Sequence, residues 1–174
     1  NVKYYFGKLK LMIVELEWYE YKMAAQVGLD RKVQSILNGH KDRYGSVWTP
    51  ISDVGWSVVS AVAECAVAKA LGMYWDGSIN TFSRPDLGDY EIKAQLHHKI
   101  DPNKHSNFLV IKPNAPDDLL HVLVLVHSNT RYEVVGFMKA SDAKVARYER
   151  QVGTRPKFYG IPARDLTDIK LLPK

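Results

Sequence analysis

The stretch that most constrains the fold is a helical run from Ile51 to Leu71 that has hardly any polar face. Between Ala61 and Ala68 every residue is small or apolar apart from Glu64. A helix without a polar face is buried on most sides, and a buried carboxylate without a partner either stays protonated or costs several kcal/mol when it ionises. We therefore expect a core helix whose acid meets a metal ion, an arginine or a lysine, with Lys69 and Lys93 as candidates for a structural salt bridge.

The helical regions are bounded or interrupted by residues that favour helix ends. Asp53 or Ser52 is expected to cap the start of the core helix, and Gly72 is expected to end it. Upstream, apolar residues recur three or four positions apart from Leu16 to Leu37, which predicts a long helix. Gly28 interrupts this pattern, so we expect two helical pieces or a bend there.

A second informative stretch runs from Pro85 to Lys93 and reads Pro-Asp-Leu-Gly-Asp-Tyr-Glu-Ile-Lys. Tyr90 to Leu96 is expected to be the second strand of a hairpin, after a first strand between Tyr74 and Ser83. Because side chains alternate along a strand, Glu91 and Lys93 share one face of it. Two aspartates precede this strand, and three carboxylates with a lysine suit a hard divalent cation, which binds oxygen ligands.

The most apolar strand pattern runs from His121 to His127. Its five central residues, Val122 to Val126, are all apolar, which predicts a central strand buried on both faces with a histidine at each end. Arg131 to Met138 is expected to return beside it as the next strand. With 174 residues, the chain is long enough for one domain with a substantial core.

The Pro-Asp, short gap, Glu-x-Lys arrangement from Pro85 to Lys93 resembles the signature of the PD-(D/E)xK nuclease superfamily. The resemblance covers most of Ile51 to Gly160 and implies the restriction-endonuclease-like fold, an α/β fold in which helices flank a central mixed β-sheet. On this interpretation residues 1–174 form a single nuclease-like domain, with an N-terminal helical extension over residues 1–50 and the core over residues 51–174.

The resemblance also implies a catalytic site. A nuclease of this class would hydrolyse phosphodiester bonds of nucleic acid, with DNA as the expected substrate, using one or two Mg²⁺ ions for which Mn²⁺ substitutes. Its lysine would orient the attacking water or stabilise charge on the phosphate. Matched position by position, the expected catalytic residues are Glu64, Asp86, Glu91, Lys93 and Gln95, and the expected metal ligands are Glu64, Asp86, Glu91 and the backbone carbonyl of Ile92.

Two acids compete for the position of the metal-binding aspartate. Asp86 is expected to occupy it, because a turn through Gly88 resets the register of the chain before the strand. If the strand ran unbroken through Gly88, Asp89 would share the face of Glu91 instead.

Basic side chains are expected to bind the polyanionic substrate. The chain has 24 Lys and Arg against 19 Asp and Glu, a net charge of +5 that favours an anionic partner. Ser141 is expected to cap a helix from Asp142 to about Gln151 that carries a basic stripe. The expected nucleic-acid contacts are Lys99 and Lys104 in a loop and Lys144, Arg147 and Arg150 on this helix, with a plain solvated surface as the alternative.

Other interpretations stay open at this point. The same fold could serve as a catalytically inactive nucleic-acid-binding module, or as a structural or assembly protein in which Glu64, Glu91 and Lys93 form a buried ion-pair network. A homodimer is open by analogy, since many enzymes of this class pair to cut two strands.

The single cysteine, Cys65, excludes an internal disulfide and indicates a reducing compartment. The sequence shows no unbroken run of about 18 apolar residues and no signal-peptide pattern. We therefore expect a cytoplasmic protein without a membrane partner. A small nuclease-like domain of this kind would suit a prokaryote, a phage or a mobile element.

Overall fold

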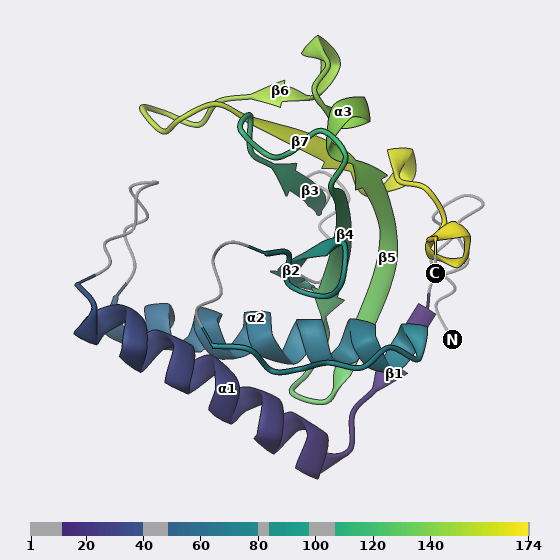
Figure 1. The fold of residues 1–174 in the computed structure, drawn as a ribbon. Coiled ribbons are helices and arrows are strands. Elements are labelled where there is room, and N and C mark those ends of the chain that lie inside the picture. The colour runs from purple at the N-terminus through teal and green to yellow at the C-terminus, as the bar shows by residue number, and fades with distance from the viewer. Residues whose placement is uncertain (1–11, 40–48, 80–83, 98–106, 174) are drawn as a thin grey trace.

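The structure, a computed structural model, describes residues 12–39, 49–79, 84–97 and 107–173 (Figure 1). Within these ranges the chain forms a first strand, two long helices and then a mostly β region that includes one short α-helix and three short 3-10 helices. The elements are β1 (Met12–Glu15), α1 (Trp18–Leu37), α2 (Pro50–Leu71), β2 (Tyr90–Leu96), β3 (Phe108–Ile111), β4 (Leu120–Val126), β5 (Arg131–Lys139), α3 (Ala140–Ala143), η1 (Ala146–Tyr148), β6 (Glu149–Arg150), β7 (Phe158–Pro162), η2 (Ala163–Asp165) and η3 (Ile169–Leu171).

The central sheet has the strand order β1-β5-β4-β2. Strand β2 runs parallel to β4, with Glu91 opposite His121, whereas β5 is antiparallel to both of its neighbours, β4 and β1. A second sheet of order β3-β7-β6 is antiparallel throughout. The expected α/β fold with a mixed β-sheet flanked by helices is therefore confirmed at this level.

The central sheet is covered on both faces, and strand β4 contributes to both cores. Helices α1 and α2 lie on one face, and the second sheet lies on the other (Figure 1). Val122, Val124 and Val126 belong to the core on the helical side, whereas Leu123 and Leu125 belong to the core beneath the second sheet. The prediction of a central strand buried on both faces is thus confirmed. The side chains of neighbouring β2 alternate between the same two faces of the sheet.

Helix α2 is the centre of the first core. All residues from Ala61 to Ala68 are buried, as the lack of a polar face predicts. The helix begins after Thr49, whose side chain accepts a hydrogen bond from the backbone N–H of Ser52, so the expected cap at Ser52 or Asp53 is wrong. It ends as predicted at Gly72, whose φ of 65° is in the left-handed region.

Among the described residues, α2 is also the helix whose length and composition would suffice to cross a membrane. In its most apolar window 44% of the residues are buried inside the fold. The core helix of a soluble protein passes the same test, so α2 is weak evidence for a membrane span.

Helix α1 is continuous through Gly28, so the expectation of two helical pieces is wrong. Gly28 is buried where α1 crosses α2. A Cβ atom at this position would lie 2.5 Å from the carbonyl oxygen of Ser57 and 2.6 Å from the Cα atom of Val58. The glycine therefore permits close contact between two helix backbones, and this packing outweighs its low helix propensity.

The N-terminal region is more than a helical extension. Residues 12–15 form β1 at one end of the central sheet, where Val14 lies opposite Tyr132 of β5. Helix α1 packs on α2, and its Arg31 side chain binds Glu64 in the interior. Residues 12–37 therefore contribute to the same core as the residues after position 51, whereas residues 1–11 and 40–48 of the expected extension lie outside the described ranges.

The hairpin expected before β2 is absent from the described residues. Residues 74–79 form no strand, and residues 80–83 lie outside the described ranges. Strand β2 pairs with β4 instead, in parallel. A parallel pairing joins segments far apart in the sequence, so no local turn pattern could indicate it.

The helix expected from Asp142 to Gln151 is also wrong. Helix α3 ends at Ala143, and the chain then continues through η1 into β6. Both Ala143 and Tyr148 are buried in the second core. Residues five apart on an α-helix point about 140° away from each other, so a regular helix would have withdrawn one of these two side chains from the core.

Candidate functional site

The turn before β2 determines where Asp86 lies. The backbones of Leu87 and Tyr90 exchange hydrogen bonds of 3.0 and 2.9 Å, and Gly88 between them has a φ of 56°. This tight turn folds Asp86 back against β2, where its Oδ2 atom accepts a hydrogen bond of 2.8 Å from the backbone N–H of Ile92. Asp86 therefore lies alongside the strand, in agreement with the prediction that a turn resets the register.

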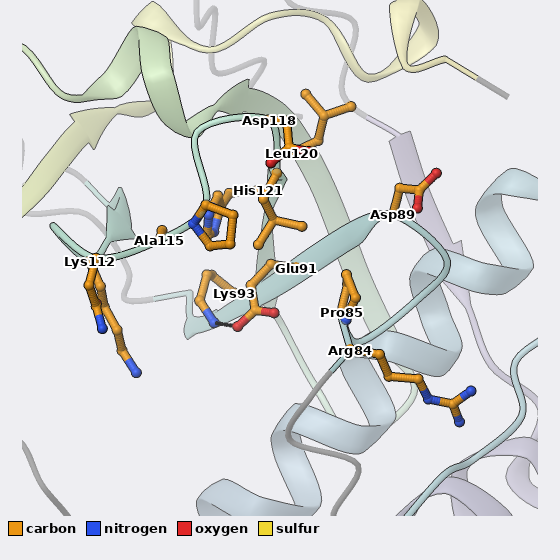
Figure 2. A pocket seen from close by; sticks show the side chains of 13 residues that line it. Arg84, Pro85, Asp89, Glu91, Lys93, Lys112, Ala115, Asp118, Leu120 and His121 are labelled. Carbon is orange, nitrogen blue, oxygen red and sulfur yellow. Dashed lines mark hydrogen bonds and ion pairs between the residues drawn. The ribbon is translucent and has the colours of Figure 1, made fainter.

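Glu91 and Lys93 share one face of β2, as the alternation predicts, and form an ion pair of 2.5 Å between Nζ and Oε1. They border a cavity of about 800 Å³ that extends toward residues 112–121 (Figure 2). They also border a second cavity, of about 320 Å³, which α1 and α2 help to line. Asp86 lines the smaller cavity with Glu91 and Lys93. Asp89 also lines the larger cavity, but Figure 2 shows its side chain directed away from the ion pair.

Asp86 is in an unfavourable electrostatic environment for an ionised carboxylate. It lines the smaller cavity together with Glu64 and Glu91. Burial, and then the charge of Glu91, raise the pKa of Asp86 from 3.8 to about 6, against the opposing charge of Lys93. A cation that reached this carboxylate would stabilise its ionised form.

Glu64 borders the same cavity, and basic and aromatic side chains already bind it. Arg31 donates hydrogen bonds of 2.6 and 2.8 Å to the two carboxylate oxygens, and Trp75 Nε1 donates another of 3.1 Å. Burial opposes the charge of Arg31, but its bonds to Glu64 outweigh this and raise the pKa of the guanidinium. The expectation that a cation balances Glu64 is met by an arginine, Arg31, which the sequence did not single out. The suggested lysines bind other acids, Lys69 to Glu20 and Lys93 to Glu91.

The donor groups along β2 fit a hard cation such as Mg²⁺. Because the N–H and C=O groups of a strand residue point to the same side, and the Ile92 N–H points to Asp86, the Ile92 carbonyl faces that side too. Within the described ranges no three acidic, imidazole or thiol side chains already form a metal cage. Asp86, Glu91 and the Ile92 carbonyl would leave room for waters and phosphate oxygens, which Mg²⁺ usually keeps as ligands.

Gln95 lies on the same face as Glu91 and Lys93, but its side chain joins the two sheets. Its Nε2 atom donates a hydrogen bond of 2.7 Å to the carbonyl of Phe108 in β3, and its Oε1 atom accepts one of 3.3 Å from the Phe108 N–H. Gln95 thus holds β3 beside β2, and its amide is directed to β3 instead of to the acids.

Lys144 binds the loop that precedes β4. Its Nζ atom donates hydrogen bonds of 2.5 Å to the carbonyl of Ala115 and 2.6 Å to the carboxylate of Asp117. The side chain is 21% exposed. Lys144 therefore fixes the loop over the larger cavity, a structural role that the expected basic stripe did not include.

The other expected nucleic-acid contacts are placed only in part. Arg147 and Arg150 are exposed, and the Arg147 guanidinium lies 4.6 Å from the centre of the Tyr148 ring. They stand on η1 and β6 and not on one helix. Lys99 and Lys104 lie outside the described residues.

His121 is a polar residue of the site that the sequence indicated only as the end of a strand. Its side chain borders the larger cavity although the residue is only 3% exposed. Burial, and then the charge of Lys93, lower the pKa of His121 to about 4, so the ring is neutral at pH 7. The available signal was a histidine at the start of an otherwise apolar strand.

The fold and the site together define an α/β protein in which an outer strand of a mixed sheet gathers acids and a lysine between two cavities. Comparison of the chain with protein-family models, with curated proteins and with solved structures gave no match in any of the three.

Proposed function

We propose that the protein is a metal-dependent nuclease of the PD-(D/E)xK kind, which hydrolyses phosphodiester bonds of nucleic acid, with DNA as the first candidate. The observation that carries this proposal is Asp86, a carboxyl with a pKa raised to about 6 that lies with Glu91 and Lys93 beside β2. The restriction-endonuclease-like fold belongs to the same proposal, and the mixed sheet flanked by helices supports it.

The roles of the residues follow from their contacts. Asp86, Glu91 and the Ile92 carbonyl would hold Mg²⁺ or Mn²⁺, which would polarise the scissile phosphate and lower the pKa of a bound water. Lys93, released from Glu91, would stabilise the negative charge that develops on the phosphate oxygens. Glu64 would act through Arg31, whose pKa is raised, against the effect of burial, chiefly by its bonds to Glu64 and further by the charge of Asp86.

Charge on the rest of the surface supports a polyanionic substrate. A group of carboxylates alone would repel a phosphodiester, so attraction must come from elsewhere on the protein. The chain carries a net charge of +5. Of the exposed arginines, Arg147 lies on η1 and Arg150 lies on β6 of the second sheet. The larger cavity gives the backbone of a nucleic acid access to Lys93.

The test is a cleavage assay with linear and circular DNA and with RNA, each in Mg²⁺, Mn²⁺, Ca²⁺ or EDTA. We expect cleavage with Mg²⁺ or Mn²⁺ and a loss of at least about 100-fold in Asp86→Asn and Lys93→Met. Asp89→Asn is the matched control, because this exposed aspartate stands in the same turn and points away. Undiminished metal-dependent cleavage by Lys93→Met would exclude the assigned role.

One observation favours a second candidate, a catalytically inactive nucleic-acid-binding or assembly protein on this fold. Glu64 and Glu91 both stand in ion pairs, with Arg31 and Lys93 respectively. If these pairs were only structural, replacing Glu91 and Lys93 together by Gln and Met would leave stability unchanged or improved. The wild-type protein would then bind nucleic acid in a gel-shift assay without cutting it in any of the metals.

A further inference from the structure

His121 is a buried polar side chain whose hydrogen-bonding capacity is unused. Within the part of the chain that the structure describes, neither ring nitrogen has a hydrogen-bond partner, and the residue is 3% exposed. A buried polar group without a partner has lost its hydrogen bonds to water without replacing them, which disfavours the folded state. His121 lines the larger cavity, so we expect its ring to gain a hydrogen-bond partner in another state of the protein.

Lys93 is the side chain best placed to become that partner. In the parallel pairing of β2 and β4, Glu91 lies opposite His121, and Lys93 lies opposite Leu123. Lys93 and His121 are therefore diagonal neighbours on one face of the sheet, a separation that a long side chain can bridge. Figure 2 shows both at the same cavity, and among the charged side chains Lys93 acts more strongly on the His121 ring than Glu91 or Lys144 does.

In the present state the Lys93 ammonium is bound to Glu91. A divalent cation on the Glu91 carboxylate would repel the ammonium and remove its acceptor. A neutral imidazole has one nitrogen with a free lone pair, so His121 can accept a hydrogen bond while its other nitrogen keeps its hydrogen. The acceptor needed by Lys93 is thus already present in the wall of the cavity.

We propose that His121 is a positioning residue for Lys93. When a cation binds the Glu91 carboxylate, the Lys93 ammonium donates a hydrogen bond to the unprotonated ring nitrogen of His121. This hydrogen bond holds the ammonium facing the larger cavity. The benefit to hydrolysis rests on the proposed nuclease function, whereas the exchange of partners requires no cleavage.

The exchange is tested by ¹⁵N NMR of the imidazole nitrogens, with the His121 signals assigned by their loss in His121→Asn. Glu91→Val removes the present partner of Lys93 without any metal, and we expect the lone-pair nitrogen of His121 to move upfield. The double variant Glu91→Val/Lys93→Met should lack this shift. Equal His121 spectra in the single and double variants would overturn the proposal.

A second measurement covers the case in which Glu91→Val does not fold. Ca²⁺ alone is added to the wild-type protein and to Lys93→Met, and the His121 shift should appear only in the wild type. A shift of the same size in both proteins would mean that the cation, and not Lys93, acts on the ring, which would also overturn the proposal.

Kinetics then separate positioning from packing. We expect His121→Leu to lower kcat about 10- to 100-fold, with KM for DNA and Tm little changed. His121→Asn keeps a hydrogen-bond acceptor and should recover part of kcat. Equal losses in both variants would refute positioning, whereas a wild-type protein without any cleavage would refute the nuclease function and leave the NMR result to decide the role of His121.

Discussion

Asp86→Asn should stabilise the fold at alkaline pH and lose this effect in acid. Folding raises the pKa of Asp86 from 3.8 to about 6, and each pKa unit corresponds to about 1.4 kcal/mol. Ionised Asp86 therefore costs the folded state about 2–3 kcal/mol once its partial exposure is taken into account. Above pH 6 the carboxylate is ionised in both folded and unfolded chains, so the cost is complete; below pH 4 both forms are protonated and it vanishes.

The assay is thermal unfolding by circular dichroism at pH 4, 6 and 8. At pH 8 the Asn variant should exceed the wild type by about 4–12 °C in Tm, since about 1 kcal/mol corresponds to 2–4 °C for a chain of this length. Mg²⁺ should raise the Tm of the wild type at pH 8 and have little effect on the variant. Asp89→Asn should show no pH-dependent gain, and a Tm difference for Asp86→Asn that does not grow from pH 4 to pH 8 would refute the reasoning.

Two further predictions concern the contact between α1 and α2. Arg31→Met should destabilise the protein by about 3–5 kcal/mol in urea unfolding, because it leaves Glu64 buried and unpaired, and Glu64→Leu in the same chain should restore most of this loss. If Arg31→Met alone is neutral, the pair does not hold the helices. Gly28→Ala should cost about 1–3 kcal/mol, because its Cβ would meet the Ser57 carbonyl at 2.5 Å. Gly55→Ala in α2, where a Cβ meets no atom within 4 Å, should instead gain about 0.5–1 kcal/mol; equal effects of the two substitutions would contradict the close helix contact.

The sequence was most informative where local chemistry decides the structure. The run around Glu64 has no polar side to expose, so its burial and the need for a partner could be predicted. Two further features are local, since each depends on a few neighbouring residues. One is the alternation of side chains that places Glu91 beside Lys93, and the other is the turn at Gly88 that brings Asp86 back against β2.

The parts that could not be predicted depend on contacts between distant segments. Arg31 lies 33 residues before Glu64, and nothing in its surroundings distinguishes it from an exposed arginine on a helix. Gly28 has the pattern of a helix breaker, and only the backbone of α2 explains its presence. His121 likewise gains its significance from β2, which lies beside β4 only in the folded chain.

The contribution of α1 and β1 to the interior limits how far the chain can be shortened. A fragment that begins at α2 would contain the whole acid and lysine cluster, yet it would lack both the strand that borders β5 and the guanidinium that neutralises the acid of the core helix. We therefore expect the segment with the recognisable motif not to fold on its own. Transplanting this site into another protein would require the first helix to be carried along with it.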